Sequence, residues 1–97
     1  MRAALSSAAE RDVKRALDYY LREAGAIVAD DFIDRLESQI EKIKLNPEAY
    51  RIVAKDLRCA NLDKFPYQIV YRIVGKTLIR VTSVRHHKQH PNFGLLR

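Results

Sequence analysis

The side chains that could carry chemistry are concentrated in the second half of the chain. Residues 51–97 hold 10 Lys/Arg against 2 Asp/Glu, whereas residues 1–50 hold 8 against 10. Cleavage of RNA by its own 2′-hydroxyl needs an acid, a base and cations that hold the phosphate. Arginine and histidine supply such groups, so the residue types permit an endoribonuclease. Its candidate catalytic residues are Arg58, Arg72, Arg85 and His86.

The same excess of positive charge also suits a binding surface without catalysis. The net charge is +8 over residues 51–97 and −2 over residues 1–50. A basic surface speeds encounter with an acidic protein, and it binds nucleic acid through counterion release. The alternative is a solvated surface that meets no partner. We favour binding, and the candidate contact residues are Arg58, Arg72, Arg80, Arg85, His86, His87 and Lys88.

A metal site is a further interpretation of the basic segment. His86, His87 and His90 form an H-H-x-x-H run, and the first and last would share one face of a helix. Pro91 follows directly, however, and no Cys, Asp or Glu lies nearby. The number of ligands is therefore low, and we expect no metal and no other cofactor.

Apolar side chains return at the end of the chain. Phe93, Leu95 and Leu96 would expose apolar area to water unless a partner covers them. A frayed terminus is the alternative. We expect the tail to contact a target or a protein partner.

Two helices precede the basic half and must support it. Ser7 and Glu10 match a capping box, which predicts a helix that begins there, and Gly25 suits its end. Residues 28–43 carry a second apolar face with helical spacing, followed by an Asn-Pro pair that ends it. The short connection predicts an antiparallel helix hairpin. Residues 1–6 suit a brief edge strand.

Strand patterns replace helical ones in the second half. A strand is predicted around residues 56–62, and alternating apolar residues predict a clearer one over residues 67–74. Gly75-Lys76 suits a two-residue hairpin loop of type II′, followed by a return strand over residues 77–84. Helices followed by strands indicate an α+β fold, in which an N-terminal antiparallel helix hairpin packs on a small antiparallel sheet.

The length of this loop sets which side chains share a face. A two-residue loop pairs Tyr71 with Arg80 and puts both on the more apolar face, which we expect the helices to cover. Tyr67 shares that face, so packing accounts for both tyrosines better than catalysis does. Arg72 and Arg85 then project from the opposite, mixed face.

Length and composition set the broad class. The 97 residues suit a single domain, which we place at residues 1–97. No run of about 18 apolar residues exists, and the N-terminus lacks a signal-peptide pattern. Cys59 is the one cysteine, so no internal disulfide forms, and a packing role is expected for it. These features predict a cytoplasmic protein without a membrane partner.

The order of elements and several short motifs resemble the ParE branch of the RelE/ParE superfamily. These proteins are toxins of bacterial type II toxin–antitoxin modules. The resemblance covers nearly the whole chain. The motifs that carry it are Phe65-Pro66-Tyr67, then Ile69-Val70-Tyr71-Arg72, and the ending Val84-x-His86 with a basic residue and Pro91.

The resemblance implies a small twisted sheet with two helices on one side and a cognate antitoxin, ParD-like or similar, as partner. RelE-like members cleave mRNA in the ribosomal A site, whereas ParE-like members generally lack the catalytic set and poison DNA gyrase. We therefore expect a toxin that inhibits DNA gyrase when free. The alternatives are a ribosome-dependent mRNA endoribonuclease and a non-toxic antitoxin-binding module. No small-molecule substrate is expected.

Overall fold

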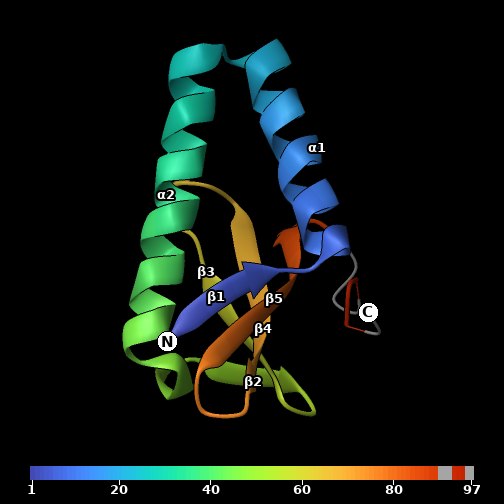
Figure 1. Ribbon diagram of the computed structural model, residues 1–97. Coiled ribbons are helices and arrows are strands. Elements are labelled where there is room, and N and C mark those ends of the chain that lie inside the picture. The colour runs from blue at the N-terminus through green and yellow to red at the C-terminus, as the bar shows by residue number, and fades with distance from the viewer. Residues whose placement is uncertain (90–92, 96–97) are drawn as a thin grey trace.

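Two paired helices pack on one face of a sheet in this protein (Figure 1). A computed structural model describes residues 1–89 and 93–95. Helix α1 spans Ser7–Glu23 and α2 spans Ala26–Leu45, and a 3₁₀ turn, η1, follows at Pro47–Ala49. The predicted α+β fold is confirmed. The five strands in this part of the chain are β1 (Arg2–Leu5), β2 (Arg51–Ala54), β3 (Leu57–Asn61), β4 (Tyr67–Val74) and β5 (Leu78–His86).

The sheet is mixed, although an antiparallel sheet was expected. Its strand order is β1-β5-β4-β3-β2, and β1 runs parallel to β5 while the other neighbours are antiparallel. The edge strand at the N-terminus is confirmed. Its direction depends on pairing between opposite ends of the chain, such as Arg2 with Leu78, and no local pattern contains that information.

Helix α1 begins one residue earlier than predicted. Ser6, rather than Ser7, is the N-cap, and its Oγ accepts a hydrogen bond from Ala9 N at 3.1 Å. The predicted capping box with Glu10 is therefore wrong. The backbone N–H of Ser6 donates to Val81 O at 2.9 Å, which holds Ser6 in the extended conformation that a cap needs.

Replacing Ser6 with alanine is expected to destabilise the protein by about 1 kcal/mol, because Ala9 N loses its acceptor. The matched control is Ser7→Ala, which removes an identical but exposed side chain and leaves the cap in place. Urea denaturation of both variants measures the two changes in the free energy of unfolding. A larger loss for Ser7→Ala would contradict the assignment of the cap.

Gly25 separates the two helices, as predicted. Its N–H donates to Tyr20 O at 2.9 Å, and its φ of 92° lies in the region that disfavours other residues. The glycine closes α1 and directly precedes α2. The hairpin end of both helices extends past the sheet (Figure 1).

The core lies between the helices and the covered face of the sheet. Phe32 and Ile43 of α2, together with Ile69 and Tyr71 of β4, have no exposed surface. Tyr71 Oη donates to Pro47 O at 2.6 Å, which ties β4 to the segment after α2. The structure therefore gives Tyr71 the packing role that the sequence predicted.

The hairpin between β4 and β5 differs from its prediction. Val74 pairs with Leu78, so the loop has three residues, 75–77, instead of two. This shift of one position turns Arg80 away from the helices, while Ile79 and Val81 take its place in the core with no exposed surface. Burying two aliphatic side chains instead of an arginine is the physical reason.

A β-bulge restores the predicted faces for the end of β5. Tyr71 pairs with Val81 and Val70 pairs with Ser83, so Thr82 is the extra residue. Beyond the bulge, Val84 points to the core and is 2% exposed, as expected. The predicted faces of β5 are therefore wrong before Thr82 and confirmed after it, while the predicted pairing partners are wrong along the whole strand.

Candidate functional site

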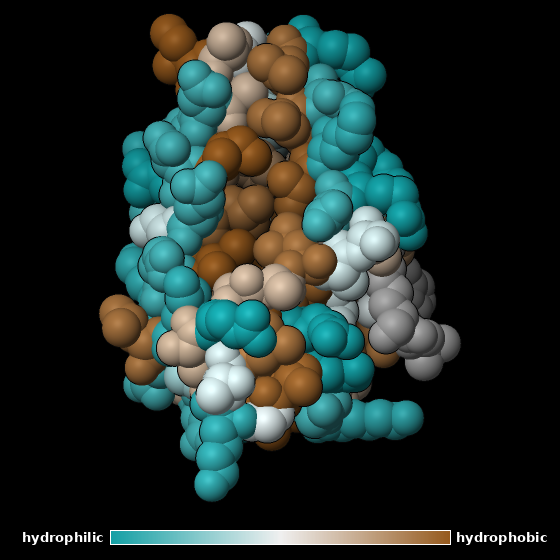
Figure 2. All heavy atoms as spheres, in the orientation of Figure 1, coloured by the Kyte–Doolittle hydropathy of each residue, from teal (hydrophilic) through white to brown (hydrophobic). Residues whose placement is uncertain are grey.

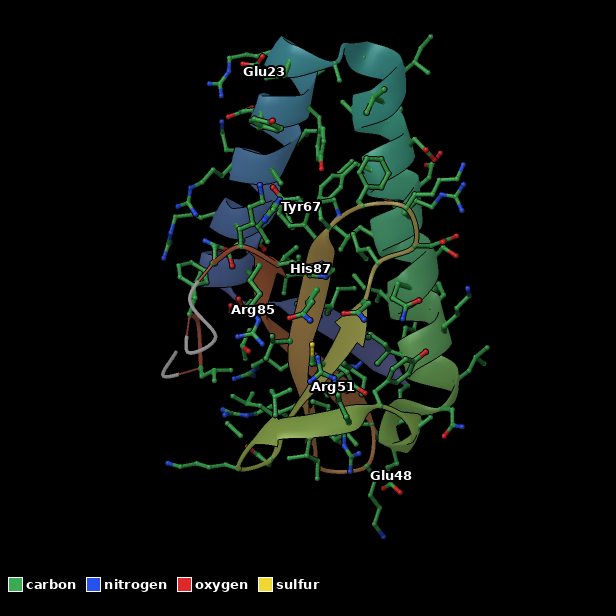
Figure 3. All side chains as sticks on the ribbon, turned by 180° about the vertical axis from the view of Figure 1, so that it is seen from behind. Glu23, Glu48, Arg51, Tyr67, Arg85 and His87 are labelled. Atoms are coloured by element: carbon green, nitrogen blue, oxygen red, sulfur yellow. The ribbon has the colours of Figure 1, made fainter. Side chains whose placement is uncertain are left out.

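The side of the sheet that faces away from the helices carries a group of cations. We call it the back face, and Figure 3 views the molecule from that side. Strand alternation and register assign its side chains. Four rows run across the strands: Asn61, Gln68 and Arg85; then Arg51, Cys59, Val70 and Ser83; then Leu57, Arg72 and Arg80; then Val74 and Leu78.

Arg85 is held in place at the upper row of the back face. It is 8% exposed, and its Nε donates to Gln68 Oε1 at 3.0 Å. Its Nη1 donates to the carbonyl oxygen of Phe93 at 3.4 Å. Gln68 Nε2 in turn donates to Asn61 Oδ1 at 3.0 Å. This chain of hydrogen bonds fixes the orientation of the guanidinium group.

A hollow of about 270 Å³ opens beside Arg85. Figure 3 shows Arg85 and His87 at its upper side and Arg51 below. Among residues 1–89 and 93–95, no carboxylate belongs to its lining. Its walls are Arg51, Gln68, Arg85, His86, His87 and Gln89. A site with two guanidinium groups, the imidazole of His87 and two amides suits an oxyanion.

Cys59 lies on the floor next to this hollow. Arg51 Nη2 donates to its Sγ at 3.8 Å. Burial raises the pKa of the Cys59 thiol, although Arg51 and Arg85 act in the opposite direction. The thiol therefore stays protonated at neutral pH, which agrees with the packing role expected for it.

Arg58, a predicted catalytic and contact residue, does not belong to the back face. It pairs with Tyr71 and lies on the helix side of the sheet. Its Nη1 donates to Tyr50 O at 2.7 Å and to Glu48 O at 3.1 Å. Arg58 thus satisfies the carbonyl groups around η1.

His86 also points to the helix side, where its ring meets that of Tyr67 with centroids 5.0 Å apart. The Lys88 N–H donates to His86 Nδ1 at 2.9 Å, so the neutral ring carries its proton on Nε2. Burial lowers the pKa of His86, and Lys88 and His87 lower it further. The four candidate catalytic residues are therefore divided between two faces of the sheet.

A second hollow, of about 550 Å³, lies between α1 and the ends of β4 and β5. We call it the α1 groove. Tyr19, Arg15 and Arg22 line its helix side, and Tyr67 and Lys88 line its sheet side. The sequence analysis missed the three α1 residues. Their spacing of three and four places them on one helix face, which is the signal that could have identified them.

Asp12 forms part of the floor of the α1 groove and joins α1 to β5. It is 3% exposed, and its Oδ2 accepts a hydrogen bond from Val84 N at 3.0 Å. Arg15 Nη1 lies 3.7 Å from Asp12 Oδ1. Within the part of the chain that the structure describes, Asp12 is the one carboxylate of the groove, and it is engaged within the protein. The exposed cations therefore make the rim of the groove positively charged.

Part of the predicted tail site can be placed. Phe93 and Leu95 are partly buried, and the Phe93 carbonyl meets Arg85. Leu96, His90 and Pro91 lie outside the described residues. In residues 1–89 and 93–95, no three His, Cys, Asp or Glu side chains are grouped to hold a metal ion. No helix in this part of the chain has the length and apolar character that a membrane span requires.

A helix hairpin on one face of a mixed sheet, with cations on the other face, defines a small α+β protein of the RelE/ParE-like type. Residues 4–91 of the sequence match the family described as "ParE toxin of type II toxin-antitoxin system, parDE". The chain belongs to the ParE toxin family, which makes it a toxin of a ParDE toxin–antitoxin system.

A solved structure has the same fold. It is described as the chromosomal ParDE TA system from P. aeruginosa, and the two chains superpose with a TM-score of 0.77. The match covers 89% of this chain and 95% of the other, at 20% sequence identity. Among curated proteins, none matches the sequence.

Proposed function

We propose that this toxin inhibits DNA gyrase when free and that a cognate ParD-like antitoxin neutralises it. The match to the ParE family over residues 4–91 is the observation that carries the proposal. The solved ParDE structure supports the antitoxin partner through its fold. No small-molecule substrate is needed for either role.

The layout of the basic residues favours binding over RNA cleavage. Arg58 is engaged with backbone carbonyl groups, and His86 Nδ1 already accepts a hydrogen bond. Arg72 and Arg85 lie on the back face, away from both. General acid–base catalysis needs its groups within hydrogen-bonding reach of one reacting centre, and these four side chains do not converge on one.

The α1 groove is the surface that we assign to the antitoxin. Tyr19 is 49% exposed on its rim, next to Arg15, Arg22 and Lys88. Figure 2 shows further apolar side chains in the trough between the two helices. A peptide that combines acidic and apolar side chains complements both features, with aromatic residues as the main anchors.

A DNA supercoiling assay with purified gyrase tests the proposed target. The free chain should inhibit supercoiling, and the antitoxin encoded beside it should restore the activity when added in equal amount. Inhibition by the folded chain that the antitoxin does not relieve would contradict neutralisation. Full gyrase activity in the presence of excess folded toxin would contradict the target.

Variants of the α1 groove test the antitoxin surface separately. Tyr19→Ala should weaken antitoxin binding by about 2 kcal/mol, because an exposed aromatic anchor is lost. Arg11→Ala is the matched control, since Arg11 is exposed on the same helix but does not line the groove. Isothermal titration calorimetry measures both affinities. Equal losses in the two variants would contradict the assignment of the groove.

A further inference from the structure

The back face leaves two of its own buried polar atoms unsatisfied. Arg72 Nε and Ser83 Oγ have no hydrogen-bond partner among the described residues. Ser83 has no exposed surface, and both side chains lie on the back face by register. Buried polar atoms are nearly always paired in folded proteins, so these two atoms mark a part of this face where the described residues supply too few hydrogen-bond partners.

Arg72 also lies opposite a second positive charge. Its register partner on β5 is the exposed Arg80, and like charges directly opposite destabilise a sheet. Asp56 Oδ1 lies 3.5 Å from Arg72 Nη2, but this carboxylate is 65% exposed and its attraction is screened by water. An anion bound between the two arginines would remove their repulsion.

The hollow beside Arg85 is a second place for an anion on the same face. Gln68, in its wall, and Arg72 are four residues apart on β4, which corresponds to about 13 Å along the strand. Arg51 and His87 on the rim are exposed. The two cationic sites are therefore separate, and one extended polyanion can reach both.

The surface between the two sites distinguishes a nucleic acid from an acidic protein. Val70, Cys59 and Ser83 form this part of the face and are at most 3% exposed. They offer no apolar pocket, whereas a bound peptide gains most of its affinity from buried apolar or aromatic anchors. A phosphodiester backbone needs only cations and polar donors, which this face supplies.

We propose that the back face binds the phosphodiester backbone of a nucleic-acid strand. One phosphate binds between Arg51, Arg85 and His87, and another binds between Arg72 and Arg80. The contacts reach phosphates rather than bases, so binding is independent of sequence. This inference does not depend on gyrase as the target, and it involves no cleavage of the strand.

Fluorescence anisotropy with labelled single-stranded and duplex DNA and with RNA of matched sequence tests the proposal. The full chain should bind at about 50 mM salt, and the logarithm of its affinity should fall linearly with that of the salt concentration. Arg51→Gln and Arg80→Gln change exposed residues, and each should lower the slope by about 0.7 to 0.9. Lys42→Gln, an exposed change of equal charge on α2, is the control.

Each result decides for or against the back face. Weaker binding and a lower slope in the two arginine variants, with Lys42→Gln close to the wild type, support it. Equal effects of all three substitutions would mean that net charge alone binds the strand, which overturns the site. Tighter binding of a polyglutamate peptide than of any oligonucleotide would overturn the choice of a nucleic acid as partner. Shortening of the RNA during incubation would show that the protein cleaves the strand, which overturns binding without cleavage. Thermal melting checks that the variants are folded. Inhibition of supercoiling is measured in a separate assay, because this inference does not depend on gyrase as the target.

Discussion

Bacteria that express this toxin without its antitoxin should form filaments and induce DNA-damage signalling while translation continues. The expectation follows from the proposed inhibition of gyrase, because blocked DNA replication halts cell division but leaves mRNA intact. A reporter for DNA damage, microscopy and incorporation of labelled amino acids measure the three effects. We expect the largest change in the reporter, since a stalled gyrase acts directly on DNA.

Two controls accompany this experiment. Co-expression of the antitoxin should abolish the effects, and Phe32→Asp should also abolish them, because it places a charge at a core position with no exposed surface. Rapid arrest of translation with cut mRNA would instead identify an endoribonuclease. Normal growth with a folded, soluble toxin would leave only the antitoxin-binding module, and either outcome contradicts the proposal.

The protein should lose about 2 kcal/mol of stability between pH 10 and pH 12 through Tyr71 alone. Burial raises the pKa of this phenol from 10.0 to about 12. An unfolded chain ionises Tyr71 near pH 10, whereas the folded protein keeps it protonated. The contribution is thus complete below pH 10 and is lost as the pH rises towards 12. Burial also raises the pKa values of Tyr20 and Tyr67, which act in the same direction.

The Tyr71→Phe variant isolates this contribution. At neutral pH it should lose about 1 kcal/mol, because Pro47 O no longer receives the hydroxyl hydrogen bond. From pH 10 to pH 12 its stability should fall less steeply than that of the wild type. Tyr19→Phe, at a half-exposed position on α1, should follow the wild-type curve. Parallel curves for wild type and Tyr71→Phe in urea titrations would show that Tyr71 does not carry the pH dependence.

The two proposed binding surfaces meet at the end of β5. His86 and Gln89 line both the α1 groove and the hollow beside Arg85. The side chain of Gln89 accepts a hydrogen bond from His86 N at 2.8 Å, which makes this segment one structural unit. An antitoxin in the groove would therefore contact the segment that walls the phosphate site, and the two ligands would influence each other.

Local patterns in the sequence were enough to predict both helices, the strands β3 to β5 and the concentration of positive charge. Apolar spacing reports which residues face a core, and this determines the type of element. The resemblance to a toxin family rested on the order of these elements together with short motifs such as Phe65-Pro66-Tyr67. The sequence also predicted correctly the face of the sheet from which Arg72 and Arg85 project.

Only the tertiary structure decided which cations act together. The three-residue loop and the bulge at Thr82 moved Arg80 to the back face, opposite Arg72. The carbonyl groups around η1 engaged Arg58, and the approach of α1 to β5 created a groove that no single segment contains. Pairing register and long-range contacts arise from burial summed over the whole core, so residues near in sequence do not encode them.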